Sequence, residues 1–312
     1  MNSWLPRFSA VLAFGAMMNF MAQAAPADAA VTPGAILVKG AWHSATDSMT
    51  PLPEEGAITN AAYENAYFGL AYPLGHDWTQ RYEGPPPSDS GYYVLAQIEA
   101  IGDSRAPSAG HVLIAAQDLF FTMAPANDAT ELVNYYKDHL GGDYEVERAP
   151  VVARIAGRDF VELDYFSSAA GLHWHVLATE IRCHVLEFVF TGASTKHLDR
   201  LVQKVNAATL VPAKEAPICI KNYAAGENLL QREEPIFPEP RFNPVPVRII
   251  IDREGRVRHT HYLSAFPEQA RSISDALSHW RFKPYVVDGQ AVEVETGITF
   301  GRPQRPRISA LR

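Results

Sequence analysis

Hydrophobic and polar positions in the C-terminal third of the chain predict two strands, a helix and a last strand. An apolar run at 245–251 and a second extended segment at 256–262 flank a turn in which Gly255 supplies a positive φ. Residues 291–300 alternate between apolar and polar, as a half-buried strand does. Between them, large apolar residues recur at helical spacing: Ala270, Ile273, Leu277 and Trp280. We expect a ββαβ unit with its helix over one face of a small antiparallel sheet.

The preceding part of the chain has a different pattern. Strand-like segments rich in aromatic and β-branched residues occupy 63–74, 92–100, 111–117, 158–166, 173–179 and 181–190, the last two being separate strands or one long bent strand. Two helices are predicted from apolar residues at helical spacing, the first at 128–140 and the second at 196–207. This arrangement predicts an antiparallel sheet with packed helices, and so an α+β fold for both parts of the chain.

The C-terminal pattern carries a family resemblance between residues 235 and 302. The helix ends in Trp280-Arg281-Phe282-Lys283-Pro284, and Asp288-Gly289 leads into the last strand. Together with the hairpin around Asp252 and Gly255, these motifs strongly resemble the C-terminal domain of the TonB family of periplasmic proteins. We expect the structural core of this domain to contain Leu277, Trp280, Phe282 and Pro284.

A second, more diffuse resemblance covers residues 60–212. It rests on Tyr67-Phe68-Gly69-Leu70 with Tyr72-Pro73 and Trp78, on Ala156-Gly157-Arg158, and on Phe188-Val189-Phe190-Thr191. These segments look like the PsbP-like α/β/α sandwich. That resemblance implies an exported binding or assembly protein that is not generally enzymatic.

The first 24 residues have the features of a signal peptide. Arg7 gives a short positive region, residues 8–21 are apolar, and Ala22-Gln23-Ala24 is a small-x-small cleavage site. We expect cleavage after Ala24 and a periplasmic protein; the alternative is an uncleaved membrane anchor. The expected divisions are a flexible lead at 25–55, a PsbP-like domain at 56–220, a Pro-rich linker at 221–246, a TonB-like domain at 247–302 and a mobile tail at 303–312.

Charge and cysteine content indicate the class of partner and the redox compartment. The net charge is −8, yet twelve Lys or Arg against eight Asp or Glu give the part from residue 235 a charge of +4. We expect no nucleic-acid partner, because the chain is exported and carries net negative charge. The two cysteines, Cys183 and Cys219, are expected in an oxidising compartment, where they would form a disulfide; the alternative is two buried thiols.

Motifs of known enzymes are missing from the sequence, which has no Gly-x-Ser-x-Gly, His-Glu-x-x-His, phosphate-binding Gly loop or Cys-x-x-Cys. We therefore predict a non-catalytic protein without a cofactor. His173 and His175 lie two apart on a predicted strand and are weak metal candidates, with His184 or His111 as a third ligand. The pairs formed by Glu162 with Asp164 and by Glu293 with Glu295 could act as acid–base dyads, but they are more typical of solvated strand faces.

The feature with a physical argument for binding is the last strand. If it lies at the edge of its sheet, an extended peptide can add to its unpaired backbone groups. The partner-binding residues predicted on this basis are Val292, Glu293, Val294, Glu295, Thr296, Ile298 and Phe300.

The TonB-like resemblance implies the same mode of binding, with an envelope protein or an outer-membrane receptor segment as partner. The alternative partner is a second copy of the same chain, in a homodimer. Two other functions stay open. One is a periplasmic metal-binding protein or hydrolase that uses the strand histidines, and the other is an energy transducer with a retained anchor.

Overall fold

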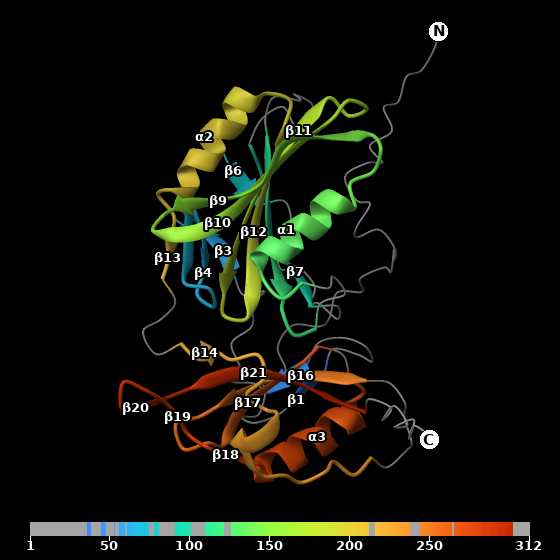
Figure 1. Cartoon of the computed structure of the whole chain (residues 1–312), viewed down its shortest axis with the longest axis vertical. Coiled ribbons are helices and arrows are strands. Elements are labelled where there is room, and N and C mark those ends of the chain that lie inside the picture. The colour runs from blue at the N-terminus through green and yellow to red at the C-terminus, as the bar shows by residue number, and fades with distance from the viewer. Residues whose placement is uncertain are drawn as a thin grey trace, which may run out of the picture.

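The structure is a computed structural model. The residues that it describes are 36–38, 45–47, 53, 56–59, 61–74, 78–80, 91–100, 110–121, 126–211, 216–237, 244–263 and 265–301. They form two units, one above the other in Figure 1. The N-terminal unit comprises the elements from β3 to β13, and the C-terminal unit comprises those from β14 to β21 together with β1 and β2.

The N-terminal unit contains two antiparallel sheets. A seven-stranded sheet has the order β6-β7-β8-β12-β11-β10-β9. Its strands are β6 (Trp78–Gln80), β7 (Tyr92–Ala100), β8 (His111–Asp118), β9 (Tyr144–Ile155), β10 (Arg158–Ser167), β11 (Leu172–Ile181) and β12 (His184–Gly192). A four-stranded sheet has the order β13-β5-β4-β3. Its strands are β3 (Gly56–Thr59), β4 (Ala62–Asn65), β5 (Leu70–Pro73) and β13 (Thr209–Leu210).

Two helices pack against the seven-stranded sheet. The helix α1 (Ala129–Asp138) begins at Asp128, whose carboxylate accepts a hydrogen bond from the backbone N–H of Glu131 and so caps the helix. Its buried Leu132 and Val133 join a small core with residues of β10, β11 and β12. The helix α2 (Thr195–Val205) contributes to a larger core, which also holds aromatic residues of the four-stranded sheet.

The C-terminal unit is built on a six-stranded sheet with the order β1-β2-β17-β16-β21-β14. Its strands are β1 (Ile36–Val38), β2 (Ala45–Asp47), β14 (Ile218–Cys219), β16 (Val245–Ile251), β17 (Val257–Tyr262) and β21 (Val294–Phe300). The helix α3 (Pro267–His279) covers one face, and the other face is turned toward the N-terminal unit (Figure 1). The remaining elements are the 3-10 helix η1 (Gly226–Asn228) and the paired strands β15 (Leu229–Gln231) with β18 (Arg281–Phe282) and β19 (Tyr285–Val287) with β20 (Gln290–Val292).

The core of the C-terminal unit agrees in part with the expected residues. Leu277, Trp280 and Phe282 are almost completely buried. Trp280 donates its indole N–H to the carbonyl of Glu233 over 2.7 Å. Pro284 is exposed, so its predicted place in the core was wrong: it lies in the connection between the short strands β18 and β19.

The expected α+β class with packed helices is contradicted. Twenty-one strands stand against three α-helices and one 3-10 helix in the described residues. About half of the structure is strand and less than a fifth is helix, so the chain is mostly β. The helices were given too much weight because each is long and strongly patterned, whereas many strands are only two to four residues long.

Three segments also join partners that their place in the sequence did not predict. The expected flexible lead contributes β1 and β2, and β2 pairs with β17. β14 lies in the expected first domain but pairs with β21 of the C-terminal unit. β15, in the expected linker, pairs with β18. The predicted signal peptide and tail lie outside the described residues.

Candidate functional site

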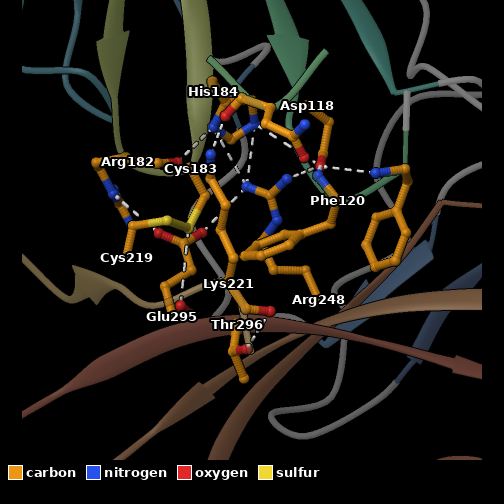
Figure 2. The surroundings of a disulfide bond; sticks show 12 residues. Asp118, Phe120, Arg182, Cys183, His184, Cys219, Lys221, Arg248, Glu295 and Thr296 are labelled. Atoms are coloured by element: carbon orange, nitrogen blue, oxygen red, sulfur yellow. Dashed lines mark hydrogen bonds and ion pairs between the residues drawn. A yellow bond between two sulfur atoms is a disulfide. The ribbon is translucent and has the colours of Figure 1, made fainter. Parts of the chain in front are cut away.

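The two units meet at a cluster of buried polar side chains, which Figure 2 shows in part. We call it the interface cluster, and its members are Tyr67, Asp118, Arg182, His184, Arg248 and Glu295. Arg248 and Glu295 come from β16 and β21, on the face of the sheet opposite α3. The other four lie at the ends of N-terminal strands or in the turns that connect them.

Arg248 is the centre of the interface cluster and is only 3 % exposed. Its Nη2 forms an ion pair with Asp118, and its Nη1 lies 3.1 Å from Oε1 of Glu295. The same Nη1 donates to the hydroxyl of Tyr67 over 2.8 Å. That hydroxyl in turn donates to Oε1 of Glu295 over 2.7 Å. One guanidinium therefore ties two carboxylates from different units together.

Arg182 completes the charge balance from the turn between β11 and β12. Its Nε lies 3.4 Å from Oε2 of Glu295, and its guanidinium stacks 3.8 Å from the centroid of the Tyr67 ring. Arg182 and Cys183 both have positive φ, 49° and 57°. Two consecutive left-handed residues are what a two-residue hairpin turn requires, so this tight turn aims Arg182 and Cys183 at the C-terminal unit.

Protonation keeps the interface cluster electrically neutral. Burial lowers the pKa of His184 to about 4, so its ring is uncharged at neutral pH. Its Nδ1–H donates to the carbonyl of Arg182 over 2.6 Å, which leaves Nε2 to accept from Arg248 at 3.0 Å. Burial raises the pKa of Glu295, but Arg248 and Arg182 more than offset that effect and hold it below its usual value. Two cations then face two carboxylates, as a closed structural contact requires.

Next to the interface cluster, a disulfide forms a covalent link between the units (Figure 2). It joins Cys183 in the β11–β12 turn to Cys219 in β14, with a Cα–Cα distance of 5.2 Å. The predicted disulfide is therefore present, and the alternative of two buried thiols is not. The two units also approach closely at Gly297, where an added Cβ would lie only 2.7 Å from Cγ of Phe120.

Most of the predicted partner-binding side chains are occupied within the chain. Val294, Glu295 and Thr296 are buried, and Glu293 forms an ion pair with Arg258 at 2.5 Å. Ile298 and Phe300 pack on the α3 side of the sheet, and Val292 is half-buried. Binding at this strand therefore has to use its backbone, and the predicted role of these residues stays a prediction.

The outer edge of β21 already accepts one strand. β14 pairs with it in parallel: the N–H of Ile218 donates to Glu293 over 2.8 Å and that of Ile220 to Glu295 over 3.0 Å. Backbone N–H and C=O groups point to alternate sides of a strand at successive residues. Those of Gly297 and Thr299, like those of Glu293 and Glu295, therefore point away from β16. In the described part of the chain, no strand pairs with this edge beyond Glu295.

A second long edge, that of β9, has features that prevent pairing. It spans 12 residues and pairs only with β10 among the described strands. Pro150 removes one N–H from the middle of it, and two register shifts interrupt its pairing with β10. Proline, bulges and charged residues on an edge strand all disfavour strand addition.

The strand histidines do not form a metal site. His173 pairs with Glu147 at 2.8 Å and His175 with Asp164 at 2.6 Å. The candidate third ligands lie elsewhere, His184 in the interface cluster and His111 beside Glu99. Across the described ranges, no group of three or more His, Cys, Asp or Glu is placed to hold a metal.

The candidate acid–base pairs are held by arginines. Arg148 contacts both Glu162, at 2.6 Å, and Asp164, at 3.1 Å. Glu293 and Glu295 each pair with an arginine of the C-terminal unit. All four carboxylates are thus used in ion pairs.

Sequence reasoning missed most of the interface cluster. The available signal was Arg248, a charged residue in the apolar run 245–251, because charges are rarely buried unless they are paired. Two of its partners, Asp118 and His184, stand at strand ends more than 60 positions away, where no local pattern marks them.

Comparisons with known proteins give a limited result. No family model matches the chain, and no curated protein does. Two similar solved structures are LpqN of Mycobacterium tuberculosis, described as involved in cell envelope biogenesis, and a cyanobacterial PsbP from Synechocystis. LpqN is 13 % identical with a TM-score of 0.33, over 46 % of this chain and 83 % of its own. The PsbP is 16 % identical with a TM-score of 0.36, over 52 % of this chain and 100 % of its own.

These scores are too low to carry an argument about function. A PsbP is among the similar structures, as the PsbP-like resemblance predicted, whereas nothing in the comparisons supports the TonB-like resemblance. Within the described ranges, none of the helices has the length and apolar character needed to cross a membrane.

Proposed function

We propose that this chain is an exported, non-catalytic binding protein of the bacterial cell envelope. It captures an extended segment of another envelope protein, which adds as a strand to the outer edge of β21. The observation that carries the proposal is β14, a short segment of the same chain that pairs with the first part of this edge. This pairing supports the proposal because a segment from outside the ββαβ unit already adds to this edge.

The remaining edge offers the groups that strand addition needs. Gly297 and Thr299 follow directly in register after Glu295, and each outward residue brings one N–H and one C=O. An added strand gains affinity from these backbone bonds and selectivity from side chains at alternate positions. The edge of β9 is blocked by Pro150, which favours β21 as the binding strand.

The interface cluster supports this function by holding the edge in a fixed position. β21 bears Glu295, which is tied through Arg248 to Asp118 of the N-terminal unit. A binding edge on a rigid support loses less entropy on binding than a mobile one. Export is supported by the Cys183–Cys219 disulfide, because disulfides persist in oxidising compartments.

Site-specific crosslinking in the host cell tests the proposal. A photoreactive residue replaces Thr299 on the edge of β21, and a matched control replaces Val152, which is 61 % exposed on β9. We expect mass spectrometry to identify one envelope protein trapped at position 299 and absent at position 152. Self-crosslinks alone would indicate a homodimer instead, and the same products at both positions would refute capture at β21.

A further inference from the structure

The segment that occupies the first part of the β21 edge is too short to stay there without help. β14 has only two residues, and two of its backbone N–H groups, counting Ile220 just beyond it, donate to β21. Strands in folded proteins usually have at least three residues, so this pairing is weak by itself. Cys219, the second residue of β14, is the point at which the disulfide attaches.

The other end of the disulfide is anchored independently of it. Cys183 lies in the tight β11–β12 turn, between Arg182 and His184. Arg182 stacks on Tyr67 and pairs with Glu295, and His184 bonds to Arg248. These contacts do not involve the sulfur atoms, so the turn and the two units keep their arrangement when the disulfide opens. After reduction, β14 is held to β21 only by its own backbone bonds and by the packing of Ile220, just beyond it, against the C-terminal core.

We propose that the Cys183–Cys219 disulfide is a redox switch that controls how much of the β21 edge a partner can use. The inference rests on the proposed function and concerns the same edge. In the oxidised chain, the outward residues beyond β14 are Gly297 and Thr299. In the reduced chain, β14 leaves the edge and exposes the backbone groups of Glu293 and Glu295 as well. The number of outward residues open to a partner therefore doubles. A partner strand then binds at least tenfold more tightly, because each extra residue contributes further backbone hydrogen bonds.

The chemical step is thiol–disulfide exchange with a dithiol reductant. Cys219 is half-buried and Cys183 is almost completely buried, so the incoming thiolate attacks the sulfur of Cys219. The S–S bond breaks, and Cys183 leaves as a thiolate that takes up a proton. The second thiol of the reductant then attacks the mixed disulfide and releases Cys219. The reductant ends as a disulfide, and both cysteines end as thiols.

Hydrogen exchange of the purified mature chain tests the switch without any partner. Exchange is compared in the oxidised protein, in the protein reduced with a dithiol, and in the double variant Cys183→Ser/Cys219→Ser. We expect the amides of Ile218 and Ile220 to exchange at least tenfold faster in the last two, while amides of β16 keep their protection. Unchanged protection of Ile218 and Ile220 would overturn the switch. Loss of protection throughout both units would also overturn it, because the disulfide would then be a general stabiliser.

Crosslinking from position 299, repeated in the double variant, separates failure of the switch from failure of the proposed function. We expect the yield of the trapped envelope protein to rise severalfold when both cysteines are serine. An equal yield in both chains would overturn control by the disulfide. If exchange shows that β14 is released but neither chain traps an envelope protein, then the proposed function fails and release of β14 stands.

Discussion

Replacing Glu187 with glutamine should stabilise this protein at neutral and alkaline pH. Glu187 lies on β12 beneath α1 and is only 2 % exposed. The hydroxyl of Tyr136, on α1, donates to its two carboxylate oxygens over 3.0 and 3.1 Å. Burial raises the pKa of Glu187 from 4.5 to about 7, and the bond from Tyr136 offsets this only in part.

The sign of the effect follows from that pKa. The folded chain holds the proton of Glu187 more tightly than the unfolded chain, whose carboxyl has an ordinary pKa near 4.5. The stabilisation is complete below pH 4.5 and is lost as the pH rises to about 7. The difference between these pKa values corresponds to about 3 kcal/mol. Glutamine keeps an acceptor for Tyr136 and does not ionise, so the variant does not lose stability as the pH rises.

His184 has the opposite pH dependence in the wild-type chain. Its pKa is lowered from 6.5 to about 4, so the unfolded state takes up a proton first as the pH falls through 6.5. Stability is therefore lost on acidification between pH 6.5 and 4. The effects of Glu187 and His184 overlap and largely cancel between pH 4.5 and 6.5. The informative quantity is the difference in unfolding free energy between variant and wild type, in which His184 cancels.

Urea unfolding of both proteins between pH 4.5 and 8.5, with the disulfide intact, measures that difference. We expect Glu187→Gln to match the wild type at pH 4.5 and to exceed it by about 3 kcal/mol at pH 8. The matched control is Glu180→Gln on β11, at an exposed position, which should show no such trend. A difference that stays flat with pH would refute the reasoning about burial of Glu187.

Other predictions concern the β21 edge and the interface cluster. Thr299→Pro removes an outward N–H and should abolish co-purification of the partner, whereas Thr299→Ala should retain it; equal binding by both would contradict strand addition. Gly297→Ala places a methyl group in the 2.7 Å contact described above and should lower the unfolding free energy by about 1–3 kcal/mol in a thermal melt, which an unchanged melting temperature would contradict. Arg248→Met leaves Asp118 and Glu295 buried without their shared cation and should cost about 3–5 kcal/mol in urea unfolding; a loss below about 1 kcal/mol would mean that the carboxylates are hydrated.

The sequence predicted the regular centre of the C-terminal unit well. The helix expected from the spacing of Ala270, Ile273 and Leu277 is α3, and the two strands around Gly255 are β16 and β17. These elements are long enough for their hydrophobic period to appear in the sequence. Their side-chain pattern also explains why Trp280 and Phe282 are buried.

What the sequence could not predict is which distant segments pair with this centre. β14 has two residues, and β1 and β2 have three each, too few to show a period. The C-terminal partners of β14 and β2 lie more than 70 positions away, and such pairing depends on the whole fold. The interface cluster has the same character: Arg248 stands out as a charge in an apolar run, but its partner Asp118 is 130 positions away and is ordinary in its local sequence.

The flanking strands of the C-terminal sheet also decide how a fragment of this protein has to be cut. β2 pairs with the end of β17 on one side and β14 with the first part of β21 on the other, and both come from segments that precede residue 220. During synthesis these segments emerge long before the strands that they cover, so the sheet is completed only when the C-terminal strands have been made. A fragment that starts at residue 235 would have two bare edges and would tend to associate with itself. A fragment that starts at residue 216 would keep one edge covered, and only the chain that includes β1 and β2 covers both.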